Sequence, residues 1–278
     1  MVAKVFAWLF FASLMPVLAS AASPDCRAIE PAARAFAEAE VTGTALILDE
    51  KAGIWTAHDC QRAEHAFSPA STFKVFNAMA ALDSDAVKDE FEVIRWDGKQ
   101  RQYPGWNRDH SLASGMKFSV VWFYQEMARR IGPEHMQNWL DKVDYGNRRI
   151  GGAIDMFWLD DSLRISARQQ IEFLRRLAAG TLPFSERAQE TARRITIIED
   201  APDWILHAKT GWATHGAADG KTDLGWVVGW VERGGRRWLF AVNIDMSTAA
   251  DAEKRLPLAR KLLTDAGAFG SAPYRFGP

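Results

Sequence analysis

Two short motifs near opposite ends of the chain most constrain how it folds. The segment S-T-F-K that begins at Ser71 places a hydroxyl three residues before the amine of Lys74, so one helical turn presents both on one face. A serine hydroxyl becomes a nucleophile when a neighbour takes its proton, and a desolvated lysine-derived group can do this. The segment Lys209-Thr210-Gly211 adds a cation, a hydroxyl and a small residue that lets a substrate approach a strand edge. The pair indicates nucleophilic catalysis by Ser71.

The S-x-x-K spacing alone is weak evidence, because a second copy runs from Ser114 to Lys117. Ser71 follows Pro69 and opens a helical pattern, where free backbone N–H groups and the positive end of the helix dipole can hold an oxyanion. The second copy has a Gly inside its turn and is interpreted as a loop with a solvated lysine. Ser71 is therefore the candidate nucleophile.

Hydrophobic patterns predict strands at both ends of the chain and helices between them. The segments with strand patterns are 42–49, 54–58, 204–210, 223–231 and 237–245. Helical patterns cover 31–40, 71–82 and 249–266, and most of the stretch 83–190. Consecutive hairpins make an antiparallel sheet, and the central helical block needs a lobe of its own. We expect an α/β protein of the α+β type, with an antiparallel sheet built from both chain ends, flanking helices and an inserted all-helical lobe.

The N-terminal residues are typical of a cleaved secretory signal. Lys4 supplies positive charge, Val5–Leu18 is a short apolar run, and the small residues that follow fit a cleavage site. The apolar run is too short for a membrane-spanning helix. We expect residues 1–22 to be a signal peptide, residues 23–278 to form a single domain, and the mature protein to be periplasmic without membrane attachment.

Cysteine count and net charge narrow the possible partners. Cys26 and Cys60 are the only cysteines, and an isolated pair in an oxidising compartment is typical of one disulfide, with two unlinked thiols as the alternative. The net charge of −1 argues against nucleic acid or an anionic membrane as the main partner. The six histidines form no H-E-x-x-H motif, so we predict no metal site. The sequence leaves the oligomeric state open.

Four further motifs accompany S-x-x-K and K-T-G. They are S-V-V from Ser119, Y-G-N from Tyr145, F-W-L around Trp158, and Trp212 directly after K-T-G. With this ordered set the chain resembles the class D, or oxacillinase-type, serine β-lactamases. The resemblance implies the fold of the penicillin-recognising serine enzymes. It also implies a small-molecule β-lactam substrate, whose ring is hydrolysed through an acyl-enzyme on Ser71.

The resemblance implies an unusual base. In this family the lysine at the position of Lys74 reacts with carbon dioxide, and the N-carboxylated side chain acts as general base without any other cofactor. An amine must be neutral to attack carbon dioxide, and burial beside Phe73, Val121 and Trp158 would disfavour its charged form. Trp158 matches the family's hydrogen-bond donor to the carboxylated lysine. Ser119 matches the residue that relays a proton to the leaving nitrogen.

The remaining site residues are also assigned by resemblance. Backbone N–H groups of Ser71 and Trp212 match the oxyanion hole. The residues expected to bind substrate are Val121, Lys209, Thr210, Gly211, Trp212 and Arg255. Arg255 on the last helix would anchor the substrate carboxylate, with Arg260 as the alternative because the spacing before that helix varies.

Two other classes of penicillin-reactive protein share part of this motif set. A sensor domain would stay acylated and would follow membrane helices, whereas only a cleavable signal is predicted here. A transpeptidase or carboxypeptidase would carry S-x-N in place of Ser119-Val120-Val121. The β-lactamase interpretation is therefore favoured. Preference among β-lactams, carbapenems included, depends on loops around Trp106, Leu159 and 212–223, whose shapes motifs do not determine.

Overall fold

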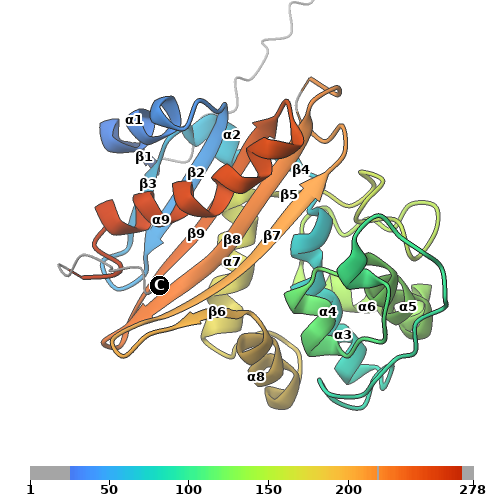
Figure 1. The fold of residues 1–278 in the computed structure, drawn as a ribbon. Coiled ribbons are helices and arrows are strands. Elements are labelled where there is room, and N and C mark those ends of the chain that lie inside the picture. Colours follow the sequence, from blue (N-terminus) through green and yellow to red (C-terminus); the bar gives the residue numbers. More distant parts are fainter. Residues whose placement is uncertain (1–25, 218, 271–278) are drawn as a thin grey trace, which may run out of the picture.

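A seven-stranded sheet built from both ends of the chain organises the fold (Figure 1). The structure is a computed structural model that describes residues 26–217 and 219–270, so the predicted signal peptide lies outside the described residues. The strands of the sheet, in spatial order, are β1 (Cys26–Ala28), β3 (Ile54–Ala57), β2 (Gly43–Asp49), β9 (Arg236–Met246), β8 (Asp223–Arg233), β7 (Ile205–Ala213) and β6 (Ile197–Asp200). All neighbours pair antiparallel except β1 and β3.

Alternation of side chains gives the sheet two buried faces. On β2, Ala45 and Ile47 face one hydrophobic cluster, while Leu46 and Leu48 face the other. The hairpin between β8 and β9 turns at Gly234-Gly235, where both residues have positive φ, as the tight turns that match strand twist require.

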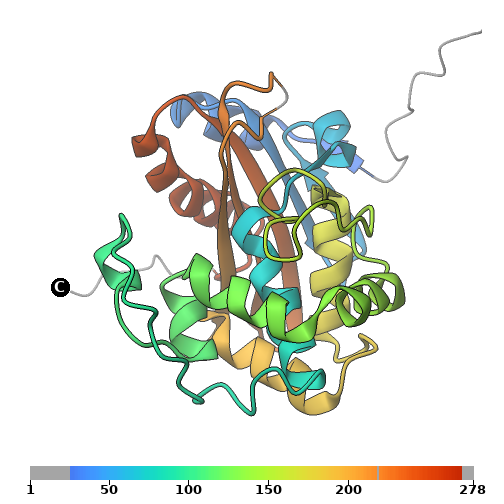
Figure 2. The ribbon, with the colours of Figure 1, turned by 90° about the vertical axis from the view of Figure 1, so that its right-hand side faces the viewer.

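Helices cover the two faces differently. The helices α1 (Glu30–Glu38) and α9 (Arg255–Asp265) pack together on one face (Figure 1). On the opposite face, α7 (Ala167–Ala178) contacts β9, β8 and β2. Most of the other helices gather beside the sheet, as the turned view in Figure 2 shows. They are α3 (Lys74–Asp83), α4 (Leu112–Lys117), α5 (Val121–Ile131), α6 (Pro133–Val143) and α8 (Glu186–Ile195).

The helix α3 joins these layers. Every residue from Lys74 to Leu82 is buried, and α3 packs against both α5 and α8. It follows directly from a 3-10 turn, Ala70–Phe73, which contacts β7. The S-x-x-K segment therefore lies where the sheet meets the helices.

The expected fold class is confirmed, but the expectation that most of 83–190 is helical was wrong, because 84–111 and 144–164 contain no α-helix. Turns and loops there connect the helices. Individual elements also differ from the prediction. The expected helix at 71–82 begins with the 3-10 turn, and the last one begins with another, Ala249–Lys254. Several very short elements were not predicted. They are β1, β6, α2 (Cys60–Glu64) and the two-stranded sheet of β4 (Ala66–Phe67) and β5 (Ile165–Ser166). Interpreting Ser114 as a loop residue was wrong, because Ser114 lies inside α4 and its hydroxyl accepts from the Ser111 backbone N–H at 2.9 Å.

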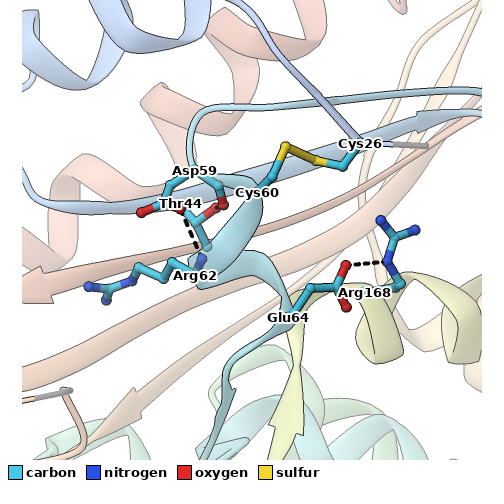
Figure 3. Close-up of a disulfide and its surroundings, with 7 residues drawn as sticks. All are labelled: Cys26, Thr44, Asp59, Cys60, Arg62, Glu64 and Arg168. Carbon is cyan, nitrogen blue, oxygen red and sulfur yellow. Dashed lines mark hydrogen bonds and ion pairs between the residues drawn. A yellow bond between two sulfur atoms is a disulfide. The ribbon is translucent and has the colours of Figure 1, made fainter. Parts of the chain in front are cut away.

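The expected disulfide is confirmed. Cys26 and Cys60 are bonded, with their Cα atoms 6.0 Å apart, and join β1 to α2 (Figure 3). Asp59 caps α2 by accepting from the Arg62 backbone N–H at 2.9 Å, and the buried hydroxyl of Thr44 donates to the Asp59 carbonyl at 2.7 Å. Within the described residues, none of the helices has the length and apolar character needed to cross a membrane.

Candidate active site

Ser71 and Lys74 meet in the first turn of the S-x-x-K segment. The Nζ of Lys74 donates to the Oγ of Ser71 at 2.6 Å. Ala70, directly before the nucleophile, has φ +47°, a left-handed conformation that costs energy for a residue with a Cβ. The sharp turn sets Ser71 at the edge of the buried layer while Lys74, fully buried, lies inside it. The amine is thus placed to exchange a proton with the hydroxyl.

The surroundings of Lys74 disfavour its charged form. Burial lowers the pKa of Lys74 well below its usual value, and the positive charge of Lys209 lowers it further. The Nζ lies 5.6 Å from the ring centre of Tyr124, which is itself buried. An amine in this environment can be neutral, and therefore nucleophilic or basic, near neutral pH.

Trp158 belongs to the same buried layer. Its indole stacks on Phe73, the neighbour of Lys74 in the chain, with ring centres 5.3 Å apart. The side chain is fully buried, and its Nε1–H has no hydrogen-bond partner among the described residues. A buried donor without a partner is costly, so this position favours a group that brings an acceptor.

A second serine–lysine pair lies near the first, since the charge of its lysine, Lys209, acts on Lys74. Ser119 lies between α4 and α5 with φ +53°, and its Oγ accepts from the Nζ of Lys209 at 2.9 Å. The same Nζ donates to the Thr210 carbonyl at 3.0 Å. Burial, followed by the charge of Arg255, lowers the pKa of Lys209 to about 7. Lys209 is therefore poised between its charged and neutral forms at neutral pH.

Gly211 lets β7 pass close to the turn that carries the nucleophile. A Cβ at Gly211 would come within 3.0 Å of the Pro69 carbonyl oxygen and 3.2 Å of the Thr72 Cγ2. Both contacts are tighter than an ordinary van der Waals approach, so a side chain there would push the strand away. The small residue keeps the strand that leads into Trp212 against the turn that holds Ser71.

The structure places Arg255, rather than Arg260, beside the K-T-G strand. The Nη1 of Arg255 donates to the Gly211 carbonyl at 2.5 Å, and its Nε donates to the Ala252 carbonyl at 2.7 Å. Arg260, five residues later, forms an ion pair with Glu199 on β6. Of the two arginines, Arg255 is the one positioned to reach a carboxylate at this strand.

The Y-G-N motif holds the base of the loop that carries Trp158. A Cβ on Gly146 would lie 2.2 Å from the Arg164 carbonyl oxygen, so only glycine fits there. The side chain of Asn147 accepts from the Arg164 backbone N–H at 3.0 Å and donates to the Ser162 carbonyl at 2.9 Å. The two residues close the loop where its ends meet.

Apolar and aromatic residues adjoin the site motifs in the chain, and several are fixed by packing or hydrogen bonds. Val121 begins α5 directly after Ser119-Val120 and is partly buried, and Leu159 follows Trp158 at the edge of the core. The indole of Trp106 donates to the Phe118 carbonyl at 2.9 Å. On β7, the Trp212 indole donates to the carboxylate of Asp223 at 2.6 Å, which fixes the aromatic residue after K-T-G.

Sequence reasoning missed the residues that brace the site. Gln170 on α7 donates to the Thr72 hydroxyl at 2.8 Å, and that hydroxyl donates to the Pro69 carbonyl at 2.7 Å. Ser68 donates to the Trp158 carbonyl at 2.9 Å. No motif marks these polar residues, because their partners are distant in sequence. Within 26–217 and 219–270, no group of three or more His, Cys, Asp or Glu side chains could hold a metal ion.

Comparisons with known proteins agree with this geometry. Residues 43–264 match the family model for the penicillin-binding protein transpeptidase domain. The chain is 42% identical to β-lactamase OXA-48 from Klebsiella pneumoniae over 228 residues, covering 82% of this chain and 84% of that protein. It is 40% identical to the probable β-lactamase YbxI from Bacillus subtilis, covering 75% and 76%.

Solved structures are similar to the chain in fold as well as in sequence. The crystal structure of FUS-1 (OXA-85), a class D β-lactamase from Fusobacterium nucleatum subsp. polymorphum, superimposes with a TM-score of 0.83 at 35% identity, covering 87% of this chain and 99% of that one. The serine–lysine geometry, the fold and the extent of these similarities together show that the chain belongs to the class D serine β-lactamases.

Proposed function

We propose that the enzyme is secreted and hydrolyses penicillin-type β-lactams through an ester on Ser71, with N-carboxylated Lys74 as general base. One observation carries the proposal: the buried amine of Lys74 lies 2.6 Å from the Ser71 hydroxyl. An amine held neutral beside a serine can activate that serine. The same amine, being neutral, can also capture carbon dioxide.

The residues around Lys74 fit a carboxylated side chain. The lowered pKa of Lys74 leaves the amine free to react, and the unpaired Nε1–H of Trp158 is a buried donor suited to an anionic oxygen. The carboxylate so formed would supply a general base beside Ser71. Its negative charge would also be balanced by the nearby charge of Lys209 when that residue is protonated.

The other residues would divide the work of acyl transfer. The Oγ of Ser71 loses its proton and attacks the lactam carbonyl carbon, while backbone N–H groups of Ser71 and Trp212 stabilise the oxyanion. As the C–N bond breaks, the ring nitrogen takes a proton through Ser119, which Lys209 contacts at 2.9 Å. Water then attacks the ester carbonyl, and the Ser71 oxygen leaves and regains its proton.

Two groups would hold the substrate carboxylate. Arg255 stays charged at neutral pH and lies against Gly211, and the hydroxyl of Thr210 lies on the same strand. Charge-assisted hydrogen bonds of this kind are roughly twice as strong as neutral ones.

Turnover of a chromogenic β-lactam such as nitrocefin tests the proposal. We expect many turnovers per enzyme molecule, and mass spectrometry with a slowly hydrolysed penicillin should find the adduct on the Ser71 peptide. A single stoichiometric burst would instead indicate a sensor that stays acylated. An adduct on Ser114 or Ser119 would contradict the assignment of the nucleophile.

The location is tested separately. Fractionation of cells that express the full chain should release activity with the periplasmic contents, and the N-terminus of the released protein should begin close to residue 23. Activity that stays with the cytoplasm or the membrane would contradict secretion.

A further inference from the structure

Ser68 connects Trp158 to the sheet. It lies between β4 and the 3-10 turn that carries Ser71, and its side chain is 1% exposed. Its Oγ donates to the Trp158 carbonyl at 2.9 Å, and its own carbonyl accepts from the Trp226 indole at 2.9 Å. Trp226 thus fixes the backbone of Ser68, and the Ser68 hydroxyl in turn fixes the backbone of Trp158.

The Trp226 anchor belongs to the K-T-G region. Trp226 lies on β8 directly opposite Gly211 on β7. Ser68 therefore links the strand pair that contains K-T-G to the loop that contains Trp158. Ser68 also lies three residues before the nucleophile in the chain. It therefore connects the K-T-G strands, the Trp158 loop and the turn that carries Ser71.

The loop around Trp158 has few other attachments at this point. The Phe157 carbonyl accepts from the Leu163 N–H, and the Leu159 N–H donates to the Met156 carbonyl, both within the loop. Across the described part of the chain, the bond from Ser68 is the one hydrogen bond that reaches Phe157, Trp158 or Leu159 from outside the loop. Gln125 on α5 holds the loop earlier, by donating to the Asp155 carbonyl at 3.1 Å, but the Trp158 carbonyl itself has the Ser68 hydroxyl as its hydrogen-bond partner.

We propose that Ser68 is a positioning residue whose hydroxyl holds the Trp158 indole where it retains carbon dioxide on Lys74. This inference rests on the proposed carboxylation of Lys74. A donor that is already in place binds an anion without a further loss of conformational freedom. Without the Ser68 hydroxyl, the buried Trp158 carbonyl would lose its partner and the loop would have to shift to find another.

The test is the bicarbonate concentration that gives half-maximal activity after carbon dioxide has been removed. Ser68→Ala should raise it about 3- to 10-fold, the range that one lost neutral hydrogen bond produces. At saturating bicarbonate the variant should approach wild-type kcat. A purely structural role would lower stability or kcat without moving the bicarbonate requirement.

Two further variants sharpen the comparison. Ser68→Cys replaces the strong donor with a weak one of similar size and should also raise the requirement, so the test survives if Ser68→Ala does not fold. Ser68→Thr keeps a hydroxyl and should stay near wild type. As a matched control, Thr44→Val removes another buried hydroxyl that donates to a backbone carbonyl, that of Asp59, and should leave the requirement unchanged.

The outcomes separate this inference from the proposed function. Suppose that wild type, Ser68→Ala and Ser68→Cys all reach half-maximal activity at the same bicarbonate concentration. This result would overturn the role of Ser68 and leave the carboxylated base intact. An active wild type that never responds would overturn the carboxylated base and the role of Ser68 together. An equal shift in Thr44→Val would show a general loss of packing and would also overturn the role of Ser68.

Discussion

The Nζ of Lys209 lies 2.9 Å from the Oγ of Ser119, although the two residues are 90 positions apart in the chain. The bond joins β7 of the sheet to the turn before α5, so it crosses the boundary between sheet and helices. Beside it, Lys74 and Ser71 form the other serine–lysine pair at 2.6 Å. Two hydroxyls with separate lysine partners can serve two different proton transfers.

The pH profile should show the titration of Lys209. Its pKa is lowered to about 7, so the side chain is charged below that pH and neutral above it. The charged form attracts the substrate carboxylate from beside Thr210, so kcat/KM should fall as Lys209 loses its proton. That fall should centre near pH 7 while Lys74 is unmodified, and at higher pH once a carboxylated Lys74 places a negative charge nearby. Measured at saturating bicarbonate, Lys209→Arg should have lower overall activity but move this alkaline limb to higher pH, since Arg stays protonated. An alkaline limb that does not move in the variant would assign it to another group.

Loss of the Trp158 donor should slow deacylation more than acylation. Trp158→Phe keeps an aromatic ring to stack on Phe73 but has no N–H, whereas Trp158→Ala removes both. We expect an acyl-enzyme that persists in both variants, observed by rapid-quench mass spectrometry. If Trp158→Phe behaves as wild type while Trp158→Ala is impaired, packing rather than the indole N–H is what matters.

Arg255→Ala should weaken productive binding of substrates that carry a carboxylate. A fully made charge-assisted hydrogen bond is worth about 1.5–3 kcal/mol, which corresponds to a loss of roughly 10- to 150-fold in kcat/KM. Arg260→Ala is the matched control, because that arginine pairs with Glu199 instead. Steady-state kinetics of both variants decide the matter, and a loss carried by Arg260 alone would contradict the placement of the carboxylate.

The contrast between these two arginines shows where sequence reasoning reached its limit. Both lie on a helix whose existence was predictable from its apolar pattern, but the helix begins with a 3-10 turn, and spacing could not tell which arginine meets Gly211. The contact of Ser119 with Lys209 was equally inaccessible, since it depends on a positive φ at Ser119 and on packing between distant elements.

Local signals were far more informative. Alternating apolar residues and Gly234-Gly235 predicted the β8–β9 hairpin, and the S-x-x-K spacing predicted the contact of Ser71 with Lys74. The short strands β1 and β6 were not predicted, whereas β3, also four residues long, was predicted because it completes a hairpin with β2. Ser114 was misassigned because its Gly was taken as a helix breaker, although a capping box at Ser111 stabilises that short helix.

Breaking the disulfide should cost stability but little activity. Cys26 and Cys60 are 34 positions apart, and closing a loop of that length is worth about 3–4 kcal/mol in the chain-entropy description. The bond joins β1 to α2, neither of which carries a proposed catalytic residue. A Cys26→Ser, Cys60→Ser variant should unfold at lower urea concentration with unchanged nitrocefin turnover below its transition. Equal stability of the two proteins would contradict this role.

The most direct test of the proposed mechanism is carbon NMR of the enzyme in ¹³C-labelled bicarbonate. We predict one protein-bound carbamate signal in the active wild type, which disappears on acidification as nitrogen protonation releases carbon dioxide and returns with bicarbonate at neutral pH. Lys74→Ala should lack the signal. Wild-type enzyme that hydrolyses β-lactams at full rate while no carbamate signal forms would contradict the account and leave the unmodified amine of Lys74 as the base.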